Sequence, residues 1–515
     1  MKPSARIGRR NYLEFWALTN MAPVWRVIRS VGPLHAAVNR FLVNRLVLKL
    51  PIRPNPLSTK AGYTSWESLT DRTFDSRHLP PVPLAASAPN PVEVAELFRR
   101  DGEARDCPRS TVLFAYFAQW FTDGFLRGDM NIPRDPRKNS SNHEIDLNQL
   151  YGLTPAVTSA LRTRSGGLLK SQVVNGGEFP PYLCELGRIK DEFAGLSVVR
   201  FDDVPFGARD ALFACGSDRA NLHIGFTMLT TLFLREHNRV ARRLAGRHPD
   251  WDDERLFQTT RNILVVLLIK IVLEEYINHI TPTLFQVRMD PAVCRTAIWH
   301  RTNHMAIEFN LLYRWHSLIP SALLAGGEER PLSDTLVGNR LLTECGIGPL
   351  FEDATTQRAG RIGLFNTDPA LLHVEEMSVT EGRAVELASF NDYRAYCGFP
   401  RLKSFAEVSS DPRVQQGLAA LYPTVDDIDF YAGIFAEDPL PGSLLSPVMQ
   451  RIITVDAFSQ AYTNPLLSPQ VYGPATFSPT GMEIIESTTS LADVLNRNLP
   501  EASRRYRARM TYARG

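Results

Sequence analysis

The feature that most restricts the fold is the segment Ile263–Glu275, whose letters ILVVLLIKIVLEE are apolar almost without interruption. It lies within a longer helical pattern, Asp253–His279, which is bounded by charged residues. A helix that is apolar on all sides belongs in a large core or in a membrane. Because crossing a bilayer takes about 20 consecutive apolar residues, this run is too short to span one. We therefore predict a long helix at the centre of a large helical body.

The rest of the chain also favours helices. Apolar residues recur with helical periodicity over Ser110–Arg127, Asn221–Leu244 and Ile307–Ser321, whereas strand patterns are few and short. The region from Arg53 to Asn90 is rich in Pro and Ser, which predicts an extended connector. We therefore predict a mainly α fold, with an N-terminal unit over residues 1–53 and a large helical domain over residues 54–515.

Charge is distributed unevenly along the chain. The formal net charge is only +2, which argues against a general nucleic-acid binder. Residues 1–50, however, contain nine basic side chains and a single acid, Glu14, interleaved with large apolar residues and interrupted at Pro23 and Pro33. Such short basic amphipathic helices are typical of a segment that lies in a membrane interface. Helices that merely pack on the body of the protein would give the same pattern, so both interpretations stay open.

The cysteines bear on compartment and on metal chemistry. The six cysteines are scattered and form no CxxC pair, which argues against a zinc site or a disulfide framework and favours a reducing compartment. The N-terminal segment also lacks the compact apolar core and cleavage site of a secretory signal. Together these features predict a peripheral, monotopic membrane protein on the cytoplasmic side.

Tyr313 and His316 are the first candidates for chemistry. In the letters IEFNLLYRWHSLIPS of Ile307–Ser321 they stand three residues apart, so a continuous helix would place both on one face. That arrangement could set a phenol beside a metal-bound imidazole. The same spacing is more often a matter of core packing, so the pair alone does not establish a cofactor site.

Several longer motifs, in order along the chain, resemble the peroxidase–cyclooxygenase superfamily of animal-type haem peroxidases, and within it the cyclooxygenase and fatty-acid α-dioxygenase branch. LREHNRV at Leu234–Val240 is similar to the central helix motif, and EFNLLYRWHSLIP to the segment that carries the radical tyrosine and the proximal histidine. Further matches are Tyr63–Pro83, Arg255–Ile277, Phe390–Arg401 and Asn464–Phe477. The resemblance implies a haem peroxidase-type helical domain preceded by short amphipathic membrane-binding helices. The sequence departs from the cyclooxygenase pattern in showing no cysteine-rich EGF-like module ahead of these helices.

On the proximal side, the resemblance implies haem b with His316 as the ligand of the iron. Asn391 is placed like the residue that hydrogen-bonds the far nitrogen of that histidine, and Tyr431 like another proximal contact. Tyr313 matches the tyrosine that oxidised haem converts to a radical. Leu222 stands near the position of a glutamate that forms an ester with haem in mammalian peroxidases, so covalent attachment is not expected.

On the distal side, Gln119 matches the glutamine of the distal helix, but Asp123 stands where the family has its distal histidine. Arg219 is placed like the distal arginine of peroxidases and α-dioxygenases. Asp123 could replace the histidine as proton acceptor, with Arg219 stabilising charge. Alternatively, Asp123 forms only an ion pair with Arg219 and peroxide chemistry is poor. The sequence does not decide between these two.

For the substrate, the resemblance places Arg53 at a channel opening, where it would pair with a fatty-acid carboxylate. Other positions match residues that line the channel, and these are Tyr276, Ile277, Thr281, Leu312, Trp315 and Ser459. Each of them alone is more often ordinary core.

Three functions follow as hypotheses. The first is a haem dioxygenase that uses Tyr313 as a radical to abstract hydrogen from a lipid before O2 adds, with a hydroperoxide as activator. The second is a haem peroxidase that oxidises small reductants, and the third a catalytically impaired haem-binding protein. All three are compatible with a membrane surface as partner and with a possible homodimer.

Overall fold

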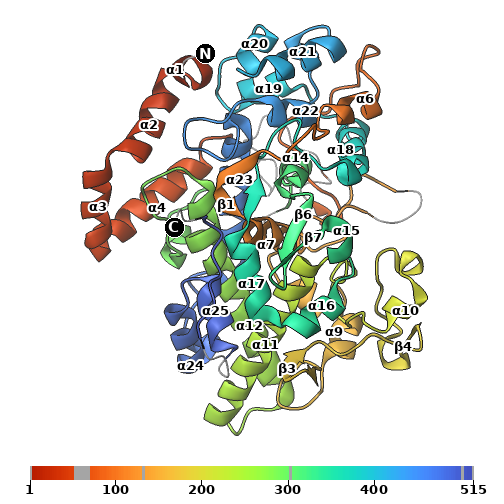
Figure 1. Ribbon diagram of the computed structural model, residues 1–515. Helices are drawn as coiled ribbons and strands as arrows, with labels where there is room; N and C mark the ends of the chain where they lie inside the picture. Colours follow the sequence, from red (N-terminus) through yellow and green to blue (C-terminus); the bar gives the residue numbers. More distant parts are fainter. Residues whose placement is uncertain are drawn as a thin grey trace.

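The computed structural model describes residues 3–51, 66, 70–129, 134–300, 304–499 and 504–512, and these form a mainly helical protein (Figure 1). The prediction of a mainly α fold is thereby confirmed. Four α-helices, α1 to α4, come first and lie along one side of the body in Figure 1. Their bounds are α1 (Pro3–Ile7), α2 (Arg9–Asn20), α3 (Ala22–Ser30) and α4 (Gly32–Val47).

The predicted central helix is present. Helix α12 (Asp253–Ile271) packs against α11 (Ile224–Arg247) and α24 (Pro474–Ser487), and its residues 263–271 are all buried. The ammonium of Lys270, the one charge in this run, donates to the carbonyls of Ile485 and Glu486 at 2.9 and 3.0 Å. Those two bonds satisfy the buried cation, so the run can be enclosed by protein.

Helix α12 does not stop at Ile271. It passes into a π-helical turn, η3 (Val272–Tyr276), and then into α13 (Ile277–Ile280), so the helical stretch extends to the end that the periodicity predicted. A π turn widens the helix by one residue and rotates the side chains that follow it. Tyr276, the last residue of this turn, is completely buried.

Helix α7 (Val112–Thr122) is shorter than the predicted helix over Ser110–Arg127. Ser110 and Thr111 belong instead to strand β1 (Asp106–Thr111), which pairs antiparallel with β8 (Arg358–Gly360) and leads directly into α7. Helix α11 likewise begins at Ile224, three residues later than predicted, because His223 is extended and caps its first turn. α7 packs against α11, and Trp120 of α7 donates to the Thr230 hydroxyl of α11 at 3.0 Å.

The prediction of one helix over Ile307–Ser321 is wrong. Helix α14 (Ile307–Leu312) ends before Tyr313, the backbone at Trp315 is non-helical (φ −89°, ψ 51°), and a 3₁₀ turn, η5 (His316–Leu318), follows. The break lets the Trp315 ring stack on Phe114 of α7, with centroids 5.8 Å apart. Tyr313 and His316 are therefore near each other in sequence without sharing a helical face.

The remaining elements surround this core. The other α-helices of the described residues are α6 (Pro91–Glu96), α8 (Asn148–Tyr151), α9 (Pro155–Leu161), α10 (Phe206–Arg209), α15 (Leu332–Thr335), α16 (Asn339–Cys345), α17 (Ile347–Thr356), α18 (Leu372–Ala384), α19 (Phe390–Tyr396), α20 (Phe405–Val408), α21 (Pro412–Leu421), α22 (Phe430–Ala436), α23 (Pro447–Tyr462) and α25 (Leu491–Arg497). The strands beyond β1 and β8 form antiparallel hairpins, which are β2 (Gln172–Val174) with β3 (Gly177–Phe179), β4 (Cys184–Glu185) with β5 (Arg188–Ile189), and β6 (Ala322–Ala325) with β7 (Glu328–Pro331).

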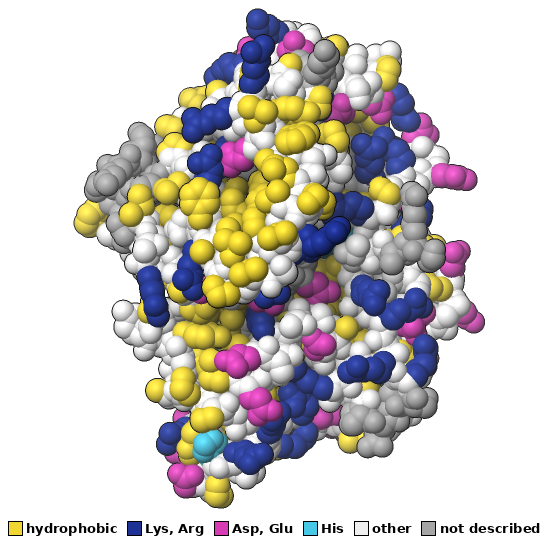
Figure 2. All heavy atoms as spheres, turned by 90° about the vertical axis from the view of Figure 1, so that its left-hand side faces the viewer, with side chains coloured by type: hydrophobic (Ala, Val, Ile, Leu, Met, Phe, Trp, Pro, Cys, Tyr) yellow, Lys and Arg dark blue, Asp and Glu magenta, His cyan; other side chains and the backbone are white. Residues whose placement is uncertain are grey.

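The N-terminal helices are amphipathic. One side of α4 packs on α23, while other side chains of α2 to α4 are exposed, among them Leu13, Trp16, Val27 and Phe41. Figure 2 shows the side of the molecule that carries these helices, with apolar side chains gathered into a patch beside Lys and Arg. In the described part of the chain, no helix is both long and apolar enough to cross a bilayer. The predicted division at residue 53 lies outside the described residues.

Candidate functional site

His316 is held by a buried carboxylate. Its Nδ1 lies 3.2 Å from Oε1 of Glu375 on α18, and the Glu375 side chain is 1% exposed. The same carboxylate accepts hydrogen bonds from the Thr367 hydroxyl at 2.7 Å and the Tyr431 hydroxyl at 2.5 Å. The contact meets the distance of an ion pair but not the geometry of a hydrogen bond, and Nδ1 has no hydrogen-bond partner among the described residues. The nearby negative charge favours the tautomer of a neutral imidazole with its proton on Nδ1, which leaves the lone pair on Nε2. The His316 side chain is 22% exposed although Trp315 and Ser317 on either side are buried, which suits a metal ligand.

The prediction that Asn391 hydrogen-bonds to His316 is wrong. Its amide oxygen accepts from Leu402 N, and its nitrogen donates to the Leu402 carbonyl and to Asp426. With both ends of its amide engaged in fixing the segment after α19, Asn391 does not serve the imidazole. Tyr431, on α22, reaches the histidine only through Glu375.

Glu375 is thus the residue that sequence reasoning missed. It is the first of two adjacent glutamates in the letters HVEEMS at the start of α18, and it is buried, whereas the second, Glu376, is partly exposed. The signal that could have identified Glu375 is a glutamate on the inner face of a predicted helix. Carboxylates are rarely buried without a partner, so such a residue indicates a nearby cation or hydrogen-bond donor.

Tyr313 lies in an aromatic cluster. Its ring contacts Phe309 edge-on, with centroids 5.0 Å apart, and Trp315 at 4.8 Å. Tyr276, from the π turn, lies close enough for the two phenol groups to affect each other's pKa. Burial raises the pKa of Tyr313 well above its ordinary value, so the phenol keeps its proton at neutral pH. Loss of an electron from this phenol must therefore be accompanied by loss of a proton.

The three predicted distal residues lie together, and Asp123 is fully engaged. Its Oδ1 accepts from Arg219 Nη1 at 2.7 Å, and its Oδ2 accepts from Arg127 Nη1 at 2.9 Å and Ser217 Oγ at 3.0 Å. Asp123 and Arg127 are only 5% and 4% exposed in their side chains. The charge of Asp123 raises the pKa of Arg219. Of the two possibilities left open by the sequence, the geometry is that of the ion pair.

Gln119 has a partner that the sequence did not suggest. Its Oε1 lies 2.8 Å from Nε2 of His223, the residue that caps α11. Nδ1 of His223 accepts from the backbone N–H groups of Gly225 and Phe226 at 3.1 and 3.3 Å. Burial lowers the pKa of His223 to about 4, so its imidazole is neutral at physiological pH. Histidine is an uncommon N-cap, and this role could not be read from the sequence.

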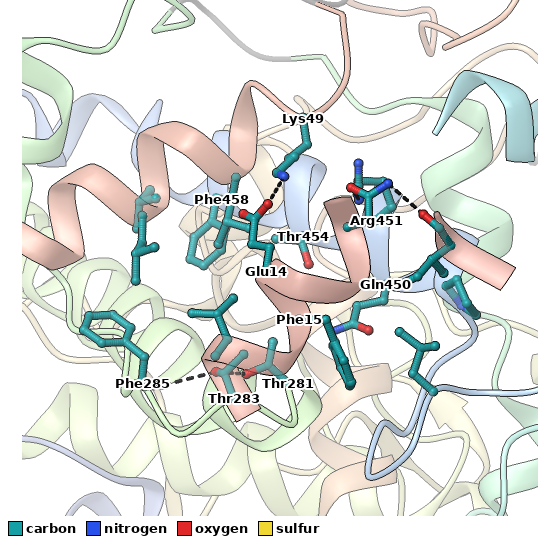
Figure 3. A pocket seen from close by; sticks show the side chains of 18 of the residues that line it. Glu14, Phe15, Lys49, Thr281, Thr283, Phe285, Gln450, Arg451, Thr454 and Phe458 are labelled. Atoms are coloured by element: carbon teal, nitrogen blue, oxygen red, sulfur yellow. Dashed lines mark hydrogen bonds and ion pairs between the residues drawn. The ribbon is translucent and has the colours of Figure 1, made fainter. Parts of the chain in front are cut away.

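The residues predicted to line a lipid channel fall into two groups. Those that are buried in the core around Tyr313 or on α23 are Tyr276, Ile277, Leu312, Trp315 and Ser459. Ser459 turns its hydroxyl back to the Val455 carbonyl of its own helix. Thr281 instead lines a cavity of about 130 Å³ between the N-terminal helices and α23 (Figure 3). Arg53 lies outside the described residues.

This cavity is mainly apolar and has a cationic end. Figure 3 shows Phe15, Phe285 and Phe458 around it, with Lys49 and Arg451 at one side. Lys49 is hydrogen-bonded to Glu14. Arg451 donates to the Cys397 carbonyl at 3.0 Å and to Asn11 Oδ1 at 3.2 Å. Among the described residues, no carboxylate lies within ion-pair distance of Arg451, and burial lowers its pKa.

A second, more open hollow adjoins the first on the outside. The two share Asn11, Lys49 and Arg451, and the outer hollow is also lined by the cations Arg9, Arg10, Arg40 and Arg45. A basic outer hollow that leads to an apolar cavity suits a molecule with an anionic head and an apolar chain.

Comparison with known sequences gives a consistent result. The family described as "Animal haem peroxidase" matches residues 125–510. Prostaglandin G/H synthase 2 of Equus caballus is 32% identical over 499 residues, which cover 94% of this chain and 80% of the relative. Prostaglandin G/H synthase 1 of Rattus norvegicus is 33% identical over 473 residues, covering 88% and 77% of the two chains.

Solved structures share the fold. A crystal structure of the fatty acid alpha-dioxygenase of Oryza sativa superposes with a TM-score of 0.70 at 18% identity, covering 97% of this chain and 96% of that one. Peroxidase A of Dictyostelium discoideum superposes with a TM-score of 0.67 at 20% identity, covering 86% and 96%.

Proposed function

Because the chain belongs to the animal haem peroxidase family, whose members are oxidoreductases, we propose that it is a haem-dependent fatty-acid dioxygenase with Tyr313 as its radical. The observation that carries the proposal is the buried Glu375 carboxylate 3.2 Å from Nδ1 of His316, with the buried phenol of Tyr313 three residues earlier in the chain. The names of the relatives, prostaglandin synthases and an α-dioxygenase, support oxygen chemistry on a fatty acid.

The residues around His316 suit haem b. Glu375 lies 3.2 Å from its Nδ1, so Nε2 would hold the haem iron, and the carboxylate would make that ligand more basic. Bound haem, once it has reacted with a hydroperoxide, would supply the oxidising power that removes an electron from a nearby phenol. Tyr431 and Thr367 hold the carboxylate in place by hydrogen bonds.

Tyr313 would then cycle between phenol and phenoxyl radical. The radical takes a hydrogen atom from a C–H bond of the lipid, which restores the phenol and leaves a carbon radical. O2 adds to that carbon radical, and the resulting peroxyl radical takes the hydrogen atom back from Tyr313. The products are a lipid hydroperoxide and the tyrosyl radical, so one activation supports many turnovers.

The substrate would be a fatty acid bound between the N-terminal helices and α23. Its carboxylate would pair with Arg451, whose guanidinium faces the cavity without a carboxylate partner among the described residues, and its chain would lie along the apolar wall. Arg53, the partner that the sequence suggested for this carboxylate, lies outside the described residues. We further propose that the exposed apolar and basic side chains of α2 to α4 rest on a membrane, from which the lipid enters.

The peroxidase alternative finds less support. Efficient cleavage of peroxides needs a distal base that can accept a proton. Both oxygens of Asp123 are occupied by arginines and a serine, and His223 is engaged at both nitrogens.

The test is a haem titration combined with O2 uptake. The wild-type protein should bind one haem and consume O2 with a fatty acid and a trace of hydroperoxide, whereas His316→Ala should lose both properties. His373→Ala, an exposed residue two positions before Glu375 on α18, is the matched control and should behave like wild type. Full O2 uptake by His316→Ala would contradict the proposal.

A further inference from the structure

The side of the site that carries Gln119 lacks the expected acid–base residue. Position 123 is an aspartate, and its two oxygens accept hydrogen bonds from Arg127, Arg219 and Ser217. Both oxygens of Asp123 are thus taken up by hydrogen bonds in a buried charge network that also includes Asp218, the second carboxylate bonded to Arg127. Asp123 is therefore not available to contact a ligand here, and the neighbours of Gln119 are the place to find a residue that is.

The tautomer of His223 is fixed by helix α11. The first N–H groups of a helix point out of its N-terminus without partners in the helix, and those of Gly225 and Phe226 are directed at Nδ1 of His223. Nδ1 must consequently be the acceptor nitrogen. In a neutral imidazole the proton then resides on Nε2, which makes Nε2 a donor.

The tautomer in turn fixes the amide of Gln119. A donor at His223 Nε2, 2.8 Å away, requires the oxygen of the Gln119 amide as its partner. The Gln119 nitrogen is therefore turned away from His223, and its two N–H groups bond to no described residue. The Gln119 side chain is exposed although its neighbours on α7 are buried, so this nitrogen is open to a ligand.

We propose that His223 is a positioning residue that holds Gln119 with its amide N–H groups directed at the ligand of the haem, in place of the missing distal histidine. This inference rests on the proposed haem site. It makes the distal side a hydrogen-bond donor without a proton acceptor, which suits a site that holds a small oxygen-containing ligand and cleaves peroxides slowly.

The carbon monoxide complex of the reduced haem protein gives a direct readout. An N–H donor beside bound CO lowers its stretching frequency, whereas an apolar surrounding raises it. Gln119→Leu should shift the band upward, and His223→Asn should shift it in the same direction. Asn keeps an acceptor that can cap α11 but is too short to reach Gln119, so the helix should stay intact.

A double variant shows whether His223 acts through Gln119. In the Gln119→Leu background, His223→Asn should add no further shift. The inference is overturned if His223→Asn leaves the wild-type band unchanged, or if it shifts the band equally in both backgrounds. Absence of any haem–CO band in the wild-type protein would overturn the haem site as well, whereas an intact band and normal O2 uptake with no effect of His223→Asn would overturn this inference alone.

Discussion

Replacing Glu375 by Gln should raise the reduction potential of the haem iron. The Glu375 carboxylate lies 3.2 Å from Nδ1 of His316 and is buried, so its charge is weakly screened. A negative partner makes the axial imidazole a stronger donor and stabilises the oxidised iron. Taking the contribution of this close contact with a charged group as about 1.5–3 kcal/mol, and since about 1.4 kcal/mol equals 59 mV for one electron, the potential should rise by roughly 60–130 mV.

Spectroelectrochemical titration of the haem-loaded protein measures this shift. Tyr431→Phe is the informative control, because it removes a donor from the same carboxylate while keeping the charge. The freed carboxylate would interact more strongly with His316, so the potential should fall slightly. A potential that stays unchanged or falls in Glu375→Gln would refute the assignment of Glu375 as the partner of His316.

Three further predictions concern stability and substrate binding. Asp123→Asn leaves Arg127 and Arg219 without their shared carboxylate and should destabilise the protein by about 3 kcal/mol, measured by urea unfolding; a loss below about 1 kcal/mol would contradict the buried ion pair. Burial lowers the pKa of His237 to about 4 and of His143 and His279 to about 3, against an ordinary value near 6.5. Each of these histidines makes stability fall as the pH drops from about 6.5 toward 4, whereas burial raises the pKa of Asp75 to about 8 and of Glu144 and Glu275 to about 7, which has the opposite effect in that window. The contribution of one histidine is therefore isolated by His279→Asn, whose melting temperature relative to wild type should rise as the pH drops from about 6.5 toward 4; a difference that does not change with pH would be inconsistent with neutral burial of His279. Arg451→Met should raise KM for a fatty acid by roughly tenfold or more but leave KM for its methyl ester unchanged, and equal effects on both would exclude Arg451 as the carboxylate partner.

The sequence was most informative where a pattern has one physical solution. The apolar segment Ile263–Glu275 could only be a buried helix, and the structure has it at the centre of the core. The sequence could not show where the helix around Tyr313 breaks, because the break coincides with packing of Trp315 on Phe114, from a distant part of the chain. Tertiary contacts of this kind override local periodicity.

In the site, too, local motifs could be identified from the sequence but contacts between distant residues could not. His316 and Tyr313 could be named from the sequence, but their partners could not. The sequence suggested Asn391 as the partner of the histidine. In the structure, the Asn391 amide is hydrogen-bonded to the backbone of Leu402, and Glu375 of α18 lies beside the histidine instead. His223 was not recognised because its role depends on where α11 begins, and helix ends are the least reliable part of a sequence prediction.

The central claim is that Tyr313 carries the radical, and O2 uptake by Tyr313→Phe tests it most directly. Wild-type and variant proteins would be loaded with haem and given the same fatty acid and a trace of hydroperoxide. The account predicts that uptake disappears in the variant while the haem spectrum stays unchanged, because the ring is kept and only the hydroxyl is lost. Undiminished O2 uptake by Tyr313→Phe, with its haem intact, would contradict it.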